Sequence, residues 1–346
     1  MSQNLQKLAK KEAGVLAFFR RQFRMHPPPL PPGTDLIGRT VIITGGSGGL
    51  GVEASRQFLR LRPAHLIVTV RSESKGDELT AKLRKEFPEA TISAWLLDME
   101  SYESIQGFVQ MCDTLPRIDI VILNAGLQKD VFERVEATGH EKTVQVNYIS
   151  TTLLTILLLP VLRFKKTSNL EDSKPPILSI VASDTAYWAK FDLKKPLIPQ
   201  FDNPKTFNHT NYQRSKLLLF WFAVKLSEII SAEDVTINLT NPGLTDGTSL
   251  NTEMFSKFNP VLRAIASSVK GFMARTVEVG ASTYIYATVV QGKESHGSYV
   301  SDWKIQPYPA VVYGETGHKA KKQLWEETMK ELEFADVANI VQQLAR

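Results

Sequence analysis

The chain has 346 residues, 43% of them apolar and 22% charged, so it can bury a large core without disulfides. Its single cysteine, Cys112, excludes an intramolecular disulfide. Six basic residues stand against one acidic residue within residues 1–25, which accounts for the whole net charge of +5. The neutral remainder argues against a nucleic-acid-binding protein.

Residues 5–25 predict an amphipathic helix with apolar side chains near one face and basic side chains largely opposite. Glu12 interrupts the apolar face, and Gly14 weakens the helix. Two interpretations stay open. Either the helix packs on its own domain or on a partner chain, or its aromatic and basic residues hold it at a membrane surface. With no secretory signal evident, we expect a cytoplasmic protein, free or peripheral on an internal membrane.

Residues 26–34, "HPPPLPPGT", predict an extended, semi-rigid linker. We therefore divide the chain into an extension and linker, residues 1–34, and one domain over residues 35–346. In that domain short apolar runs alternate with helical segments, which predicts βαβ units and a parallel sheet buried on both faces. The fold class expected is α/β, a single Rossmann-type doubly wound sheet with helices on both faces. The expected strands are 40–45, 65–70, 91–97 and 118–126, and residues 151–162 are expected in a core helix.

The loop "VIITGGSGGLG", residues 41–51, follows the first strand and matches three patterns. One makes Ser47 the nucleophile of a hydrolase elbow, but such an elbow normally follows several strands, and no motif singles out a histidine. The other two place a dinucleotide pyrophosphate at a helix N-terminus, where glycines admit the backbone to the phosphates. They use either Gly46, Gly48 and Gly51, or Gly45, Gly49 and Gly51 after Thr44. The histidines lack the spacing of metal ligands, so no metal site is expected.

Four further signals follow in order: "LNAG" at 123–126, Asn147, Ser183 at a strand end, and the Tyr212–x–x–x–Lys216 pair. Each is weak alone. Together they resemble the short-chain dehydrogenase/reductase family over about residues 38–310. Within that family the chain is most similar to retinol-dehydrogenase-like members, especially fungal ones. The resemblance favours the pattern T-G-x-x-x-G-x-G for the glycine loop.

Tyr212 and Lys216 are four residues apart, so they share a helix face, and a nearby ammonium lowers the pKa of a phenol. The resemblance implies that Tyr212 is the acid/base and that Lys216 assists it and holds the nicotinamide ribose. It implies that Ser183 hydrogen-bonds the substrate oxygen. Asn147 would support a water linked to Lys216. A nucleotide fold that serves as a non-redox scaffold or binding protein is the alternative.

The cofactor is expected to be NADP(H), because the Arg71 guanidinium ends the second strand and suits a 2′-phosphate, although Glu73 stands nearby. Asp98 resembles the family's adenine-contacting acid. Thr245 is our choice to contact the cofactor, with Thr248 as its rival. The remaining residues implied at the cofactor are Gly45, Ser47, Gly49, Leu50, Gly51, Asn124, Ala125, Gly126, Pro242 and Gly243.

Two segments rich in large apolar residues, 184–201 and 249–273, are expected to shape the substrate pocket. Either could instead belong to the local core. The substrate predicted is a bulky lipophilic secondary alcohol and its ketone, or an aldehyde. The subfamily resemblance suggests fungal secondary metabolism. Whether the chain forms a homo-oligomer stays open. The candidate contacts are Tyr187, Trp188, Phe191, Met254, Phe255 and Phe258.

Overall fold

The computed structural model describes residues 1–168, 174–246 and 274–345. Within these residues, eight strands form one sheet in the order β3-β2-β1-β4-β5-β6-β7-β8. Neighbouring strands are parallel except β8, which pairs antiparallel with β7. Their bounds are β1 Thr40–Ile43, β2 His65–Val70, β3 Ile92–Leu96, β4 Ile120–Leu123, β5 Ile177–Val181, β6 Thr236–Asn241, β7 Tyr299–Ser301 and β8 Lys304–Gln306.

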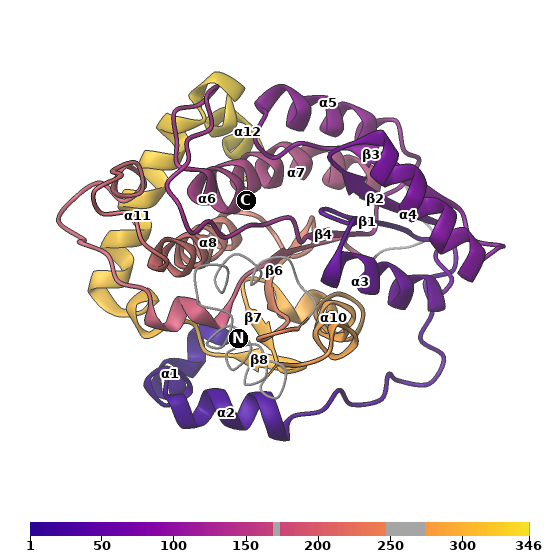
Figure 1. Cartoon of the computed structure of the whole chain (residues 1–346), viewed down its shortest axis with the longest axis horizontal. Coiled ribbons are helices and arrows are strands. Elements are labelled where there is room, and N and C mark those ends of the chain that lie inside the picture. The colour runs from indigo at the N-terminus through magenta and orange to yellow at the C-terminus, as the bar shows by residue number, and fades with distance from the viewer. Residues whose placement is uncertain (169–173, 247–273, 346) are drawn as a thin grey trace, which may run out of the picture.

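Helices cover both faces of this sheet (Figure 1). The α-helices described are α1 Gln6–Glu12, α2 Val15–Arg24, α3 Gly49–Arg60, α4 Glu73–Glu86, α5 Tyr102–Asp113, α6 Lys142–Val144, α7 Thr151–Ser168, α8 Thr210–Ile229, α10 Val277–Ile285, α11 Gly314–Glu331 and α12 Val337–Leu344. Two π-helical turns, Gln145–Ser150 and Tyr286–Val290, continue α6 into α7 and extend α10. Short 3-10 helices span Ser2–Leu5, Asp184–Trp188, Ile198–Gln200, Gly292–Ser295, Ala310–Val312 and Glu333–Ala335.

Alternation along each strand divides the core into two layers. In β1, Val41 and Ile43 join the cluster with α3, α4 and α10, whereas Ile42 joins the cluster with α5, α7 and α8. All four β1 side chains are buried. Burial on both faces explains why the strands read as continuous apolar runs, as in other parallel sheets. The expected α/β fold, a mostly parallel sheet with helices around it, is confirmed.

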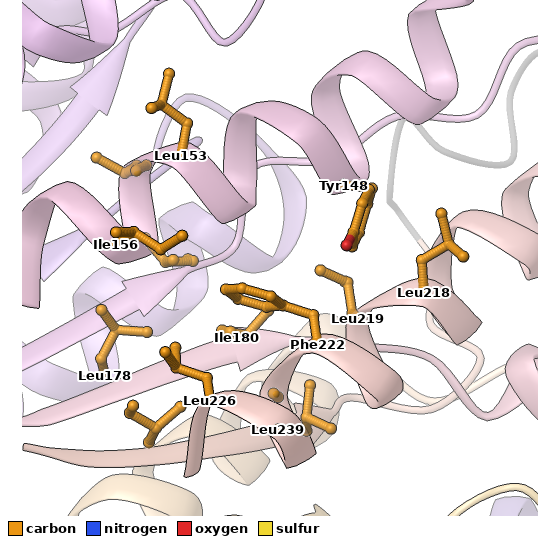
Figure 2. Close-up of a cluster of buried hydrophobic side chains, with 14 of the residues drawn as sticks. Tyr148, Leu153, Ile156, Leu178, Ile180, Leu218, Leu219, Phe222, Leu226 and Leu239 are labelled. Carbon is orange, nitrogen blue, oxygen red and sulfur yellow. The ribbon is translucent and has the colours of Figure 1, made fainter. Parts of the chain in front are cut away.

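The larger core layer lies between α7, α8 and the sheet (Figure 2). Leu153 and Ile156 of α7 and Phe222 of α8 belong to the buried cluster above Leu178 and Ile180 of β5. The continuous helical stretch Lys142–Lys165 is long and apolar enough to cross a membrane by length and composition, but 89% of its most apolar window is buried inside the protein. Its apolar character is therefore explained by packing in the core.

The N-terminal segment is not the single helix predicted for residues 5–25. Gly14 adopts an extended conformation between α1 and α2, with φ −71° and ψ 149°. The break lets Glu12 turn inward, where it is buried and accepts hydrogen bonds from Arg20 and Arg21 at 2.8 and 3.0 Å. Figure 1 shows α1 and α2 beside the β8 edge of the fold. There the Ser2 hydroxyl accepts a hydrogen bond from the Tyr299 amide at 2.9 Å, so the segment packs on its own body.

Candidate active site

The glycine loop between β1 and α3 has the geometry of the pattern T-G-x-x-x-G-x-G. Gly45 and Gly49 have φ of +67° and +46°, values that disfavour a side chain. A Cβ added to Gly51 would lie 2.3 Å from the carbonyl oxygen of Gly45. By contrast, Gly48 has an extended φ of −163° and open space around a built Cβ. The loop therefore depends on the glycines of this pattern more than on Gly48.

Hydrogen bonds tie the glycine loop to the end of β4. The Ala125 amide donates to Thr44 Oγ1 at 3.0 Å, and Asn124 Nδ2 donates to the carbonyl oxygens of Thr44 and Gly45 at 2.9 and 3.2 Å. The Tyr284 hydroxyl of α10 donates to Asn124 Oδ1 at 2.9 Å. Asn124 is thus fixed on both sides of its amide, which explains how "NAG" and the glycine loop act as one unit.

A cavity of about 500 Å³ lies along this loop at the carboxyl ends of β1, β2, β3 and β4. Arg71 and Lys75 are both exposed residues in its wall, whereas Glu73 is not among its lining residues. Open space beside tight glycines and two cations fits a phosphate-bearing dinucleotide. Ten of the residues expected to bind the cofactor line it: Gly45, Ser47, Gly49, Leu50, Gly51, Arg71, Asp98, Asn124, Ala125 and Gly126.

A second cavity of about 280 Å³ adjoins the first and contains three of the four expected catalytic side chains, those of Ser183, Tyr212 and Lys216. The two cavities share Leu50, Asn124, Gly126 and Gln128 in their walls. The Pro242–Gly243 turn after β6 lines this second cavity, and Gly243 has φ +76°. Thr248 lies outside the described residues. The expected residues that line the second cavity are Ser183, Tyr212, Lys216, Pro242, Gly243 and Thr245.

Lys216 is buried on α8, and its Nζ donates a 2.7 Å hydrogen bond to the carbonyl oxygen of Val181 at the end of β5. Burial lowers the pKa of Lys216 to about 8. Gly126 separates this amine from Asn147: a Cβ on Gly126 would lie 3.5 Å from Lys216 Nζ and 3.2 Å from Asn147 Oδ1. A side chain at that position would crowd both polar groups.

Asn147 stands behind the cavity, in the π-helical turn Gln145–Ser150. Its Oδ1 accepts a hydrogen bond from the Leu127 amide at 2.8 Å, and its Nδ2 donates to the Leu127 carbonyl at 2.8 Å. Nδ2 also donates to Ser215 Oγ at 3.0 Å, next to Lys216. Asn147 therefore joins the loop after β4 to α8, and it is not among the lining residues of either cavity.

Tyr212 lies in the first turn of α8. Burial raises the pKa of Tyr212 to about 12, although a hydrogen bond with Ser183 acts in the opposite direction. Ser183 caps the 3-10 helix Asp184–Trp188, and its Oγ accepts hydrogen bonds from the amide and hydroxyl of Thr185 at 3.3 and 2.9 Å. Tyr212 is thus a neutral phenol near pH 7, with a hydroxyl group beside it.

Of the residues expected to contact substrate, Trp188 lines the second cavity. Tyr187 instead donates to the Pro307 carbonyl at 2.6 Å, and Phe191 packs in the core against Trp221, with ring centroids 5.8 Å apart. Met254, Phe255 and Phe258 lie outside the described residues.

Among the residues of the cavity walls that sequence reasoning missed are Lys75, Tyr284 and Phe18. Lys75 lies in the first turn of α4, only four positions after Arg71, so its closeness in the chain was a usable signal. No sequence signal points to Tyr284 or Phe18, because both come to the site from distant elements.

Known proteins resemble this chain along its length. The family described as short chain dehydrogenase matches residues 39–170. The short chain dehydrogenase virL of Hypocrea virens is 47% identical over 347 residues and covers 100% of both chains. The short chain dehydrogenase/reductase mfmJ of Annulohypoxylon moriforme is 46% identical over 331 residues, 94% of each chain.

Among solved structures, the L-sorbose reductase of Gluconobacter frateurii, in complex with NADPH and L-sorbose, superposes with a TM-score of 0.60. Its sequence identity is 17%, and the match covers 78% of this chain and 96% of that chain, so it supports the fold. The full-length relatives settle the family: this chain belongs to the short-chain dehydrogenases/reductases. It is an oxidoreductase of a family that uses a nicotinamide cofactor and a small-molecule substrate.

Proposed function

We propose that the protein interconverts a bulky lipophilic secondary alcohol and its ketone, using NADP(H), with Tyr212 as the proton donor and acceptor. The observation that carries this proposal is the junction of the two cavities at Asn124 and Gly126. One cavity has a wall suited to phosphates, and the other holds Tyr212 and Lys216. A dinucleotide long enough to pass the junction would therefore reach the side chains that handle protons.

The cofactor supplies or removes the hydride. Tyr212 is protonated near neutral pH, so its hydroxyl can donate a proton to the carbonyl oxygen during reduction. In the reverse direction it must accept that proton, and the Lys216 ammonium favours the phenolate by its charge. Ser183 lies close enough to Tyr212 to hydrogen-bond it, so its hydroxyl can also hold the substrate oxygen.

The choice of NADP(H) rests on Arg71 and Lys75, two cations in the wall of the cofactor cavity. A guanidinium binds a phosphate through two parallel hydrogen bonds, and an ammonium adds a second charge. Glu73, the acidic residue nearest in sequence, begins α4 and is not among the lining residues. The NADPH held by the related L-sorbose reductase supports the same choice.

The preference for a lipophilic substrate rests on the apolar wall of the catalytic cavity. Phe18, Trp188 and Leu244 line it beside the polar groups of Ser183 and Tyr212. A pocket of this kind binds apolar molecules and orients them by a few hydrogen bonds. A role in fungal secondary metabolism agrees with the source organisms of the two similar chains, and we include it in the proposal.

Titration of the purified protein with NADPH and with NADH, followed by quenching of tryptophan fluorescence, tests the cofactor assignment. We expect NADPH to bind at least about tenfold more tightly than NADH. Equal or tighter NADH binding would refute the role given to Arg71 and Lys75. Failure of both cofactors to bind would favour a non-redox scaffold on the same fold.

We also propose that the protein resides in the cytoplasm and touches an internal membrane through α2. Val15, Leu16, Phe19 and Phe23 are all exposed on this helix, and Leu16 is 86% exposed. Three lysines of the neighbouring α1 and Arg20 of α2 are exposed as well. Apolar side chains flanked by cations suit an anionic lipid surface.

Sedimentation with phosphatidylserine-containing vesicles tests the membrane contact. We expect the wild-type protein to sediment with these vesicles, and a Leu16→Glu variant to stay in the supernatant. Vesicles of phosphatidylcholine alone are the control for charge. Equal recovery of both proteins with the anionic vesicles would refute the contact.

A further inference from the structure

Helix α2 reaches into the catalytic half of the molecule through Arg21, which is only 3% exposed. The Arg21 guanidinium lies 3.4 Å from an oxygen of Asp184 and 3.6 Å from one of Asp302. Asp184 follows Ser183 and lines the catalytic cavity. Because removing one partner of a buried ion pair leaves an uncompensated charge, this contact couples α2 to the loop after β5.

A second pair of contacts joins α2 to the loop after β6. Gln22 Nε2 donates to the Leu244 carbonyl at 2.9 Å, and the Leu244 amide donates back to Gln22 Oε1 at 3.3 Å. Arg275 donates to the carbonyl oxygens of Arg21 and Pro242, at 2.8 and 3.3 Å. The turn that contains Gly243 is therefore held between α2 and a buried arginine.

Phe18 of the same helix forms part of the cavity wall. Its ring meets Trp188 edge to face, with centroids 5.8 Å apart. Trp188 Nε1 in turn donates to the Ala13 carbonyl at 2.9 Å. The aromatic wall thus joins one residue of the extension to one residue of the loop after β5.

We propose that residues 13–24 are a built-in part of the active site, in which Phe18 walls the substrate cavity and Arg21 is the positioning residue. This inference rests on the proposed function for its substrate and on the contacts above for its geometry. Arg21 and Gln22 hold the two loops that carry Ser183 and the Pro242–Gly243 turn. Phe18 then limits the bulk of the substrate that fits beside Tyr212.

Amide hydrogen exchange tests the attachment without requiring turnover. We expect Arg21→Met to speed exchange at residues 183–188, and Gln22→Ala to speed exchange at residues 242–246, by about tenfold or more, because each substitution frees the loop that its side chain holds. Arg20→Met is the matched control, since Arg20 is partly exposed and pairs with Glu12. If Arg21→Met does not fold, the double variant Arg21→Met/Asp184→Asn removes the unpaired carboxylate and tests the same contact. Unchanged exchange in these loops would overturn the inference.

A kinetic readout separates positioning from general stability. We expect Arg21→Met to lower kcat for cyclohexanone by about tenfold or more while the Kd for NADPH stays within about twofold. Arg21→Lys, which keeps the charge, should recover most of the lost kcat. Parallel loss of kcat and NADPH affinity, with no rescue by lysine, would mean a merely structural role.

Substrate selectivity tests Phe18. We expect Phe18→Ala to change the ratio of kcat/KM for 2-decalone over cyclohexanone by about tenfold or more. Phe334→Ala, an exposed phenylalanine of another surface, should leave the ratio unchanged. An unchanged ratio in Phe18→Ala would refute the proposal that Phe18 walls the substrate cavity. If the wild-type protein reduces neither ketone, the proposed function fails for these ketones, whereas the exchange measurement still decides the attachment.

Discussion

The ammonium nitrogen of Lys216 lies 5.8 Å from the centre of the Tyr212 ring, one helical turn along α8. Both side chains line the same cavity, and the 2.7 Å hydrogen bond to the Val181 carbonyl holds the amine there. The two side chains need no other element to bring them together, since helical spacing alone places them on one face. The sheet contributes the carbonyl group that fixes the amine.

Replacement of Tyr212 by phenylalanine should abolish most turnover and leave the cofactor bound. The variant keeps the ring but loses the only proton that we assign to the reaction. Loss of a general acid costs about 10²–10⁴-fold in rate. Stopped-flow oxidation of NADPH with a ketone measures the rate, and fluorescence quenching measures binding. A Phe variant with wild-type turnover would require another proton donor.

Two glycines of the loop, Gly51 of both dinucleotide patterns and Gly48 of the rejected one, should differ in their tolerance of alanine. Gly51→Ala places a Cβ 2.3 Å from the Gly45 carbonyl oxygen, so we expect a loss of stability on the order of 1–3 kcal/mol. A Cβ in Gly48→Ala meets open space, so the free energy of unfolding of this variant should lie within about 0.5 kcal/mol of the wild-type value. Thermal unfolding of the cofactor-free protein measures both. Similar losses in the two variants would contradict the geometry of the loop.

Removal of the two cations in the cofactor cavity should change cofactor preference. We expect Arg71→Ala/Lys75→Ala to weaken NADPH binding by about tenfold or more, because charge-assisted hydrogen bonds to the phosphate are lost. NADH lacks that phosphate, so its affinity should change little. Lys82→Ala on the same helix, outside the cavity wall, is the matched control. Equal weakening of NADPH binding and NADH binding would mean that the two cations bind the pyrophosphate, which both cofactors share.

His140 should make the fold less stable as the pH becomes alkaline. Burial lowers the pKa of His140, but hydrogen bonds with Asp202 and Glu331, at 2.9 and 3.0 Å, outweigh it and raise the pKa to about 9. Because the pKa of His140 is higher in the folded state than in the unfolded state, the protonated histidine stabilises the fold. This contribution is fully present when the pH is below the unfolded-state pKa near 6.5, and it is lost as the pH rises through about 9. The full contribution is on the order of 3 kcal/mol.

The matched comparison is wild type against His140→Gln, because other groups titrate equally in both proteins. We expect the difference in their free energies of unfolding to be largest below about pH 6.5, to shrink as the pH rises toward 9 and to level off above it. Denaturant unfolding at a series of pH values measures it. A difference that stays constant or grows with pH would contradict the assigned charge state.

Local sequence patterns predicted much of the secondary structure. The expected strand at residues 65–70 matches β2 residue for residue, because a strand buried on both faces needs an uninterrupted apolar run. The single helix predicted for residues 5–25 is wrong, since periodicity does not show that Gly14 breaks the helix. One of the acidic partners of Arg21, Asp184, stands 163 positions away, which no local pattern reveals. The roles of Asn147, Ser183 and Arg71 stay predictions.

The sequence by itself determined individual strands, the glycine loop and the Tyr212–Lys216 pair, since each depends on residues close together in the chain. Only the tertiary structure decided what surrounds them. It brought α2 against the loops after β5 and β6, and it placed Phe18 opposite Trp188 in one cavity. The reason is physical: a buried charge such as that of Arg21 must find opposite charges wherever the fold presents them, whatever their distance along the chain.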